Sequence, residues 1–518
     1  MLRGRLTEHV VRGLPLRLVG GPRRPLSSGS LRSPYLRRSH YRPLKASALT
    51  TPDCISDQQL RTFYGAQLLL TSLAILAILL TGACATALLV HGCVAALWMV
   101  TLVVLYPTLI CRIDPYVVLS YILWMHLSLL LLYLSGDSTN YSDSLLSRAS
   151  LMVLLGYAST AAGMIFRFSG NGMSHIPTIS RRALLLAGCV CLTLSAPVCV
   201  YSNSFFQMRS VPAVFRYLTV FSVPAVGFFL AAVLIRKTTL SKSLLGFATL
   251  FALVDPSRRA LVTIVLMYVF AFVFSTVLRR RALIPRHMLI WLIIGALIIF
   301  FGSIARRAQT RDRTATGGFA GDFAHNLSTL RDLDAGPIFL ETLQIYPDLA
   351  AFEGGRTVLA LAVNPIPRAL WEAKPVSMSV IMAFRRAGQF EDIEFNTDNW
   401  AEIARGSFSV TFVGEMWANF GWGGVVFGPL LLAWAYRYLE EFFSISNVAI
   451  LWPFYMAGIV GAILIQNRGD LLAANYYAMA ILLFGTCILW VISRALGIAA
   501  NHQRLGQQLG AVEPLGNK

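Results

Sequence analysis

The sequence predicts an all-α protein that crosses a membrane many times, and three observations support this. The chain is 56% hydrophobic and only 13% charged, with a mean hydropathy of +0.63, whereas soluble domains carry about 25% charged residues. Apolar runs of about 20 residues recur along it, the length of helix that spans the hydrocarbon core. Polar residues are concentrated in one interval, 303–407, which holds thirteen of the chain's 25 acidic residues.

The apolar runs predict eleven or twelve membrane helices. Eleven of them are long enough to span or nearly span a bilayer: 63–82, 85–107, 115–134, 150–168, 182–201, 212–235, 259–278, 288–304, 422–438, 448–466 and 473–494. A shorter run at 243–254 ends against Asp255 and Pro256 and predicts a further, short helix. We include it because the alternation of Lys/Arg-rich and Lys/Arg-poor connections downstream depends on it.

These runs divide the chain into five parts: a basic tail at 1–61, helices 1–9 at 62–304, a long polar loop at 305–407, helices 10–12 at 408–496, and a second tail at 497–518. Lys and Arg cluster in alternate short connections such as 279–286, whereas 136–147 and 202–212 are poor in them. Short connections rich in Lys and Arg stay on the inner side of a membrane. Both tails are therefore predicted inside and the long loop outside.

The net charge of +19 does not require a nucleic-acid partner. Residues 1–61 supply +9 of it, with twelve Lys/Arg against Glu8, Asp53 and Asp57. A disordered basic tail near anionic lipid explains such a segment. Its Arg/Ser-rich composition also resembles an organellar transit peptide, and a start site assigned too early would give the same pattern.

No motif in the sequence predicts a metal or a cofactor. The eight cysteines mostly lie in or beside apolar runs and form no C-x-x-C pair, which is typical of small core residues. The eight histidines show no ligand spacing. No G-x-x-x-x-G-K-[ST] sequence is present, so no nucleotide is expected to power the protein directly.

Two arginine-containing turns lie on the predicted outer side, against the general charge pattern. They are Ser257-Arg258-Arg259 and Asn467-Arg468-Gly469-Asp470. Arginine at a membrane edge is often an anchor whose head group reaches into water. Two such clusters on the side of an Arg-containing loop favour a second interpretation, a site for an anionic head group, because guanidinium binds phosphate in a bidentate manner.

Two motifs in and after the long loop carry the remaining signal. The first runs from Asn364 to Pro375 and combines three prolines with Arg368 and Lys374; it is either a rigid surface turn or a rigid carrier of fixed charge. The second runs from Gly414 to Gly424 and contains Glu415 at the start of an apolar run. A carboxylate at membrane depth is costly unless it is paired or functional. Gly424 and Gly428 favour helix packing.

Together, the string I-P-R-x-L-W-x-x-K-P, the later string G-E-x-x-x-N-F-G-x-x-G and the two arginine turns resemble the oligosaccharide repeat-unit polymerases, the O-antigen polymerases of the Wzy type. The resemblance covers roughly residues 240–495. It implies a GT-C-like membrane glycosyltransferase that inverts configuration without a metal. It also implies a location in the bacterial inner membrane, with both termini cytoplasmic and the long loop periplasmic.

Such enzymes transfer a growing glycan from its undecaprenyl diphosphate carrier onto the next lipid-linked repeat unit, which yields O-antigen, capsule or exopolysaccharide. The expected partners are therefore the lipid-linked oligosaccharide, the bilayer and a chain-length regulator protein. Cationic side chains can neutralise a leaving diphosphate, and the candidates for this role are Arg258, Arg259, Arg368, Lys374 and Arg468. The acceptor hydroxyl needs a base; Glu415 is the first candidate, followed by Asp470 and His325.

Three other functions compete with this one. An O-antigen ligase shares the architecture and the donor but transfers the glycan to lipid A core, and no residue excludes it. A non-enzymatic lipid-linked oligosaccharide flippase also has about twelve helices but needs no hundred-residue outer loop. A dolichol-phosphate-type mannosyltransferase would carry carboxylates in its first outer loop, and the loop at 81–84 has none.

Overall fold

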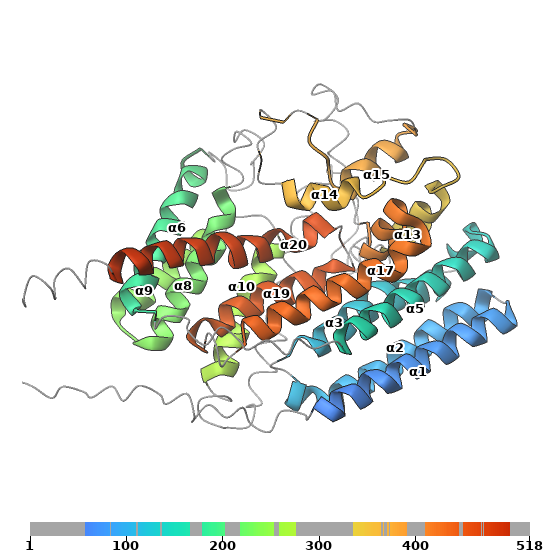
Figure 1. Cartoon of the computed structure of the whole chain (residues 1–518), viewed down its shortest axis with the longest axis horizontal. Helices are drawn as coiled ribbons and strands as arrows, with labels where there is room; N and C mark the ends of the chain where they lie inside the picture. The colour runs from blue at the N-terminus through green and yellow to red at the C-terminus, as the bar shows by residue number, and fades with distance from the viewer. Residues whose placement is uncertain are drawn as a thin grey trace, which may run out of the picture. The chain divides into compact units, whose positions relative to one another are not determined.

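The computed structural model describes residues 57–82, 84–109, 112–134, 137–165, 179–201, 218–252, 258–275, 335–363, 366, 370–371, 373–390, 410–444, 449–467, 469 and 471–497. All of them belong to the unit Leu49–Lys518. Within these ranges every regular element is a helix (Figure 1). Four helices are long and apolar enough to cross a membrane: Thr62–Thr81, Asp143–Ile165, Phe412–Phe442 and Ala480–Gly497. The prediction of an all-α fold is confirmed for this part of the chain, whereas the number of spans and their sidedness stay predictions.

The first group of helices coincides with the first four apolar runs. It consists of α1 (Asp57–Thr81), α2 (Cys84–Leu109), α3 (Asp114–Tyr121), the π-helical turn η2 (Ile122–His126), α4 (Leu127–Leu134) and α5 (Asp143–Ile165). α1 and α2 both pack on α5, and α5 packs along α17 (Phe412–Phe442). Gly163 permits this last contact, because a Cβ there would lie 2.4 Å from the backbone oxygen of Leu430.

The second group consists of α6 (Arg181–Tyr201), η5 (Thr219–Phe221), α8 (Ser222–Ile235), α9 (Thr239–Ala252) and α10 (Arg258–Val273). α8 packs between α6 and α9. Gly188 lets α6 approach closely, since a Cβ there would lie 2.6 Å from the ring of Phe229. The short helix predicted at 243–254 is present as α9.

The polar interval contains three short helices, α13 (Ala335–Ile345), α14 (Arg356–Val363) and α15 (Met378–Arg386). α13 packs against α5 and α17 through the fully buried Phe339 and Leu343. The backbone N–H of Gly336 donates to Ser128 Oγ at 2.7 Å, and Arg148 donates to the carbonyl of Leu343 at 2.8 Å. This part of the loop is therefore built onto the long helices.

The last helices are α17, η8 (Ala449–Leu451), α19 (Trp452–Gln466) and α20 (Leu471–Met479), which continues through the π-helical η9 (Ala480–Gly485). α10 runs antiparallel to α19. Thr263 lies beside Gly461, and Phe270 packs on Trp452 with ring centroids 5.5 Å apart. The beginning of α10 therefore lies at the end of α19.

α17 is broken at Gly421, which has φ +60° and ψ −142°. The residues before the break, 412–420, are called the entry segment here. In a continuous helix, residues eight apart are separated by about 12 Å, yet a Cβ on Gly424 would lie 2.0 Å from the backbone oxygen of Met416. The Met416 side chain also reaches Gly428, at 2.5 Å from its ideal Cβ position. The entry segment is thus folded back against the longer segment, 422–442.

Candidate functional site

Glu415 stands at the centre of a buried polar cluster that joins three elements. Its side chain is fully buried in the entry segment of α17. Oε1 accepts a hydrogen bond from the hydroxyl of Thr357 in α14 at 2.6 Å. Oε2 accepts one from the backbone N–H of Leu471, the first residue of α20, at 2.5 Å. A carboxylate at a helix N-terminus is stabilised by the unsatisfied amides and by the helix dipole there.

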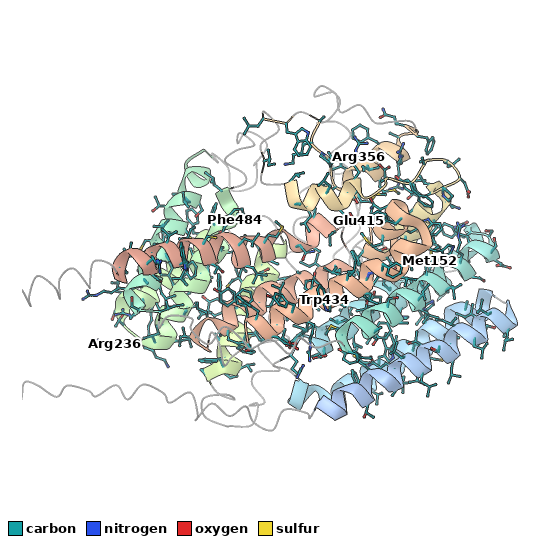
Figure 2. The ribbon with its side chains drawn as sticks, in the orientation of Figure 1. Met152, Arg236, Arg356, Glu415, Trp434 and Phe484 are labelled. Carbon is teal, nitrogen blue, oxygen red and sulfur yellow. The ribbon has the colours of Figure 1, made fainter. Side chains whose placement is uncertain are left out.

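Asn419, one helical turn further along the entry segment, forms hydrogen bonds within the same cluster. Its Nδ2 donates to Thr357 Oγ1 at 2.7 Å and to the Glu415 carbonyl at 2.8 Å, and its Oδ1 accepts from Gly355 N–H at 3.0 Å. The backbone amides of Glu353 and Gly354 donate to the carbonyls of Ala418 and Asn419. The turn before α14 therefore satisfies carbonyl groups that the break at Gly421 leaves without helical partners. We call Glu415, Thr357, Asn419, Gly355 and Leu471 the Glu415 cluster; Figure 2 labels Glu415 beside Arg356, the first residue of α14.

A buried ion pair supports the turn before α14 from the other side. Arg385 of α15 contacts Glu353 Oε1 at 2.9 Å, and the hydroxyl of Tyr346 donates to the same oxygen at 2.7 Å. Burial, together with the nearby Glu353 charge, raises the pKa of Tyr346, so the phenol stays protonated. Burial alone would lower the pKa of Arg385, but its hydrogen bonds to Tyr346 and Glu353 outweigh burial and raise it. Arg385 is thus charged at any physiological pH.

The turn that leads into α20 is held at both ends. Gly469 N–H donates to the Ile465 carbonyl at 2.9 Å, and Asn467 Nδ2 donates to Ser120 Oγ at 3.3 Å. Leu471 is fixed by Glu415. Because α10 begins where α19 ends, its first residues, Arg258 and Arg259, start their helix at the same end of the bundle as this turn.

The sequence-predicted site residues fall into three groups. Glu415 and Lys374 are described completely. Arg258 and Arg259 are described by backbone only, and Arg368, Arg468, Asp470 and His325 lie outside the described residues. The described parts of three motif segments nevertheless lie at one end of the bundle: the entry segment, the turn before α20 and the beginning of α10.

Lys374 is buried and forms a hydrogen bond within its own loop. The side chain is 5% exposed and Nζ donates to the carbonyl of Ile366 at 2.8 Å, which closes the proline-rich turn on itself. The sequence presents this lysine as a ligand for diphosphate, and that role stays a prediction. In the structure it binds a backbone carbonyl eight residues earlier in the chain.

Sequence analysis missed Thr357, Gly355 and the ion pair of Glu353 and Arg385. Asn419 stands in the G-E-x-x-x-N string, and its spacing of four from Glu415 was a signal that both share a helix face. Thr357 carried no signal, because it lies in an apolar stretch some sixty residues away in sequence. Only the fold brings it to Glu415.

The hydrogen bonds and burial of Glu415 affect whether it can act as a general base. A general base must come within hydrogen-bond reach of the proton that it removes. Both carboxylate oxygens of Glu415 already accept hydrogen bonds from the protein, and the side chain has no exposed surface. This arrangement favours a positioning role, in which Glu415 fixes the start of α20 and so the turn 467–470. Its role as the base stays a prediction.

Comparison of the chain with protein-family models, with curated proteins and with solved structures finds no match. Within the described ranges, no three His, Cys, Asp or Glu side chains come together as a metal-binding group. The described part of the chain is therefore all-helical, with membrane-length helices and a hydrogen-bonded polar site at one end of α17.

Proposed function

We propose that this chain polymerises undecaprenyl-diphosphate-linked oligosaccharide repeat units at the periplasmic face of the bacterial inner membrane. In this proposal the diphosphate of the donor is bound by Arg258, Arg259, Arg368 and Arg468. The acceptor hydroxyl of the next repeat unit attacks the anomeric carbon, its proton passes to a base, and the carrier diphosphate leaves.

One observation carries the proposal further than the motifs alone. The entry segment, the turn before α20 and the beginning of α10 are separated by more than 200 residues at the extremes, yet they lie at one end of the bundle. Glu415 holds the entry segment to the start of α20 through the hydrogen bond from Leu471 N–H at 2.5 Å. Guanidinium groups that converge on one place can stabilise a leaving diphosphate without a metal.

Glu415 has a positioning role in this proposal, and Asp470 and His325 are the candidates for the base. Asp470 directly precedes Leu471, whose amide donates to Glu415. Lys374, in the sequence string that contains Arg368, is held by the Ile366 carbonyl.

The product distinguishes this function from its rivals. Purified protein in liposomes, supplied with lipid-linked repeat units, should produce a ladder of glycan lengths on the lipid carrier. A ligase would give capped lipid A core when that acceptor is added and no ladder without it. A flippase would change only the side on which the lipid-linked unit is found. Either of these last results would replace the proposal.

A further inference from the structure

A column of buried polar side chains runs through the first group of helices, away from the Glu415 cluster. Its members come from α1, α2, η2 and α5, and each is at most 3% exposed: Tyr64, Gln67, Tyr157, Trp98, His126 and His91. α2 contributes no Asp, Glu, Lys or Arg over its whole length. Polar and ionisable groups in membrane-length helices are costly and are commonly functional.

Contacts link the members except at one step, where Tyr64 and Gln67 are neighbours one helical turn apart on α1. The hydroxyl of Tyr64 donates to Asp114 Oδ1 at 2.6 Å. Tyr157 donates to Gln67 Oε1. Its ring contacts that of Trp98 at a tilt of 37°, with centroids 3.8 Å apart.

The column ends in two histidines. The ring of Trp98 meets His126 edge-on, with centroids 4.9 Å apart. Nδ1 of His126 lies 2.7 Å from Nδ1 of His91, a hydrogen bond in which one ring is the donor and the other the acceptor. His126 closes the π-helical turn η2, and such turns are frequent at functional sites.

Several polar atoms of this column are unused. Four of its buried atoms have no hydrogen-bond partner within the described part of the chain: Gln67 Nε2, Trp98 Nε1, His91 Nε2 and His126 Nε2. A buried polar atom without a partner is destabilising. Polar residues that serve only to join membrane helices pair with one another, so these unpaired atoms point to exchange with a small polar species.

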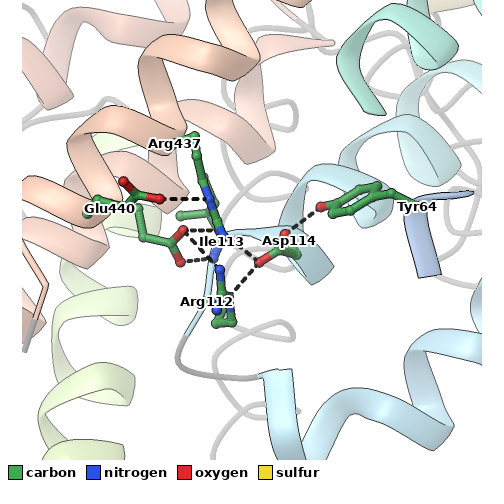
Figure 3. A network of polar contacts seen from close by, with 7 residues as sticks. Tyr64, Arg112, Ile113, Asp114, Arg437 and Glu440 are labelled. Carbon is green, nitrogen blue, oxygen red and sulfur yellow. Dashed lines mark hydrogen bonds and ion pairs between the residues drawn. The ribbon is translucent and has the colours of Figure 1, made fainter. Parts of the chain in front are cut away.

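Asp114, at the other end, belongs to an ionic network (Figure 3). Arg112 and Arg437 lie 3.0 Å and 3.5 Å from Asp114 Oδ2, and Arg437 lies 2.5 Å from Glu440. Glu441 lies 3.4 Å from Arg437. Two guanidinium groups thus face three carboxylates, so one carboxylate can hold a proton while each arginine keeps an anionic partner.

We propose that the polar column is a proton-transfer path between the Asp114 network and His91. Because the two histidines share one Nδ1 proton, one ring has a bare Nε2 and the other carries its proton on Nε2. A proton that binds the bare Nε2 makes that ring cationic, and its Nδ1 proton passes to the partner ring. The partner then releases its Nε2 proton. One proton enters and one leaves, and the two tautomers are exchanged; rotation of both rings about their Cβ–Cγ bonds then restores the donor and acceptor arrangement for the next proton. Water completes the path at the unpaired atoms of Gln67, Trp98 and the histidines.

The test needs no sugar substrate, so its failure is distinct from failure of the polymerase proposal. Full-length protein is reconstituted in liposomes that contain a pH-sensitive dye, and a potassium diffusion potential drives protons inward. Wild type should acidify the lumen faster than protein-free liposomes do. Tyr64→Phe and His126→Gln should return the rate to that of protein-free liposomes.

Tyr436→Phe is the matched control, because Tyr436 is also a buried tyrosine but lies outside the column and donates to Asn475. It should keep the wild-type rate. A wild-type rate equal to that of protein-free liposomes would overturn the proposal. So would an unchanged rate in both column variants, or an equal loss in Tyr64→Phe and Tyr436→Phe.

Discussion

Glu415 shows at the residue scale how a motif carboxylate can act through the backbone. Each of its oxygens binds a different element, one through Thr357 of α14 and the other through Leu471 of α20. The charge therefore does two things: it compensates the N-terminus of α20 and it fixes the residue that follows Asp470. Removal of the charge should affect the turn 467–470 as well as Glu415 itself.

Glu415→Gln tests this role directly. A glutamine can accept from the Leu471 amide and donate to the Thr357 hydroxyl, so the contacts can be kept, but the negative charge that strengthens both bonds and compensates the N-terminus of α20 is lost. We expect the free energy of unfolding in detergent to fall by about 1–3 kcal/mol, seen as a lower unfolding midpoint. We also expect weaker binding of the lipid-linked donor. A variant with normal stability and donor binding but turnover reduced by roughly 10² or more would instead establish the general-base role.

The pair of Glu353 and Arg385 gives a second test, with its control at the next residue. Arg385→Met leaves Glu353 buried without its cation and should cost about 3–5 kcal/mol. Arg386 pairs with Glu341 at 2.8 Å, but its side chain is 39% exposed, so Arg386→Met should cost at most about 1 kcal/mol. Chemical unfolding of the purified variants measures both. Equal losses would mean that the Glu353 pair does not stabilise the turn before α14.

The break in α17 governs the site at the element scale. Gly421 supplies a left-handed φ that other residues adopt only with strain, and Gly424 leaves room for the carbonyl of Met416. The entry segment can therefore turn back on the helix that follows and present Glu415 and Asn419 to α14.

Three Gly→Ala variants distinguish the effect of disturbing the break in α17 from the ordinary effect of alanine on helix propensity. Gly421→Ala introduces strain at φ +60° and Gly424→Ala introduces a clash, so each should lower stability by about 1–3 kcal/mol and reduce polymer formation. A Cβ on Gly423 would meet nothing within 4 Å, and Gly423→Ala should be neutral or slightly stabilising. The measurements are unfolding midpoint and product length. If all three variants behave alike, the break has no special role.

The element scale also separates what the sequence predicts from what it does not. Apolar runs located helices such as α1, α2 and α6 closely, because the thickness of the bilayer and the pitch of the helix fix that pattern. They missed the entry segment of α17, which begins ten residues before the predicted run 422–438, and the three short helices α13, α14 and α15 of the polar interval. Gly424 and Gly428 were correctly assigned to packing, although their neighbour is Met416 of the same element. The contacts of Thr357 with Glu415, and the burial of Lys374, depend on which distant segments meet. A single sequence gives residue types and their spacing, but it does not give tertiary contacts between distant segments.

At the scale of the whole molecule, α17 connects two polar regions of different kinds. The Glu415 cluster lies in its entry segment, and the network of Asp114, Arg437 and Glu440 lies near its other end. The charge pattern of the sequence places Arg112 and Arg437 on the inner side and the long loop on the outer side. In the structure Arg112 and Arg437 share Asp114 and Glu440, so they lie at the same end of the bundle; the side of the membrane that this end faces stays a prediction.

Cysteine labelling tests the sidedness. In a variant without the eight native cysteines, a cysteine introduced near Gly318 should react with a membrane-impermeant reagent in intact cells, whereas one introduced in the tail 1–61 should react only after lysis. The reverse pattern would place the long loop in the cytoplasm, where lipid-linked repeat units are not polymerised.

The measurement that addresses the proposed activity most directly is the stoichiometry of carrier release. Purified wild-type protein in liposomes receives only lipid-linked repeat units, with no nucleotide, and both new glycosidic bonds and freed undecaprenyl diphosphate are counted over time. Polymerisation predicts a ladder of products with one carrier diphosphate released for every glycosidic bond formed, and loss of both in Arg368→Ala. Absence of chain growth, or chain growth without release of the carrier, would contradict the proposed function.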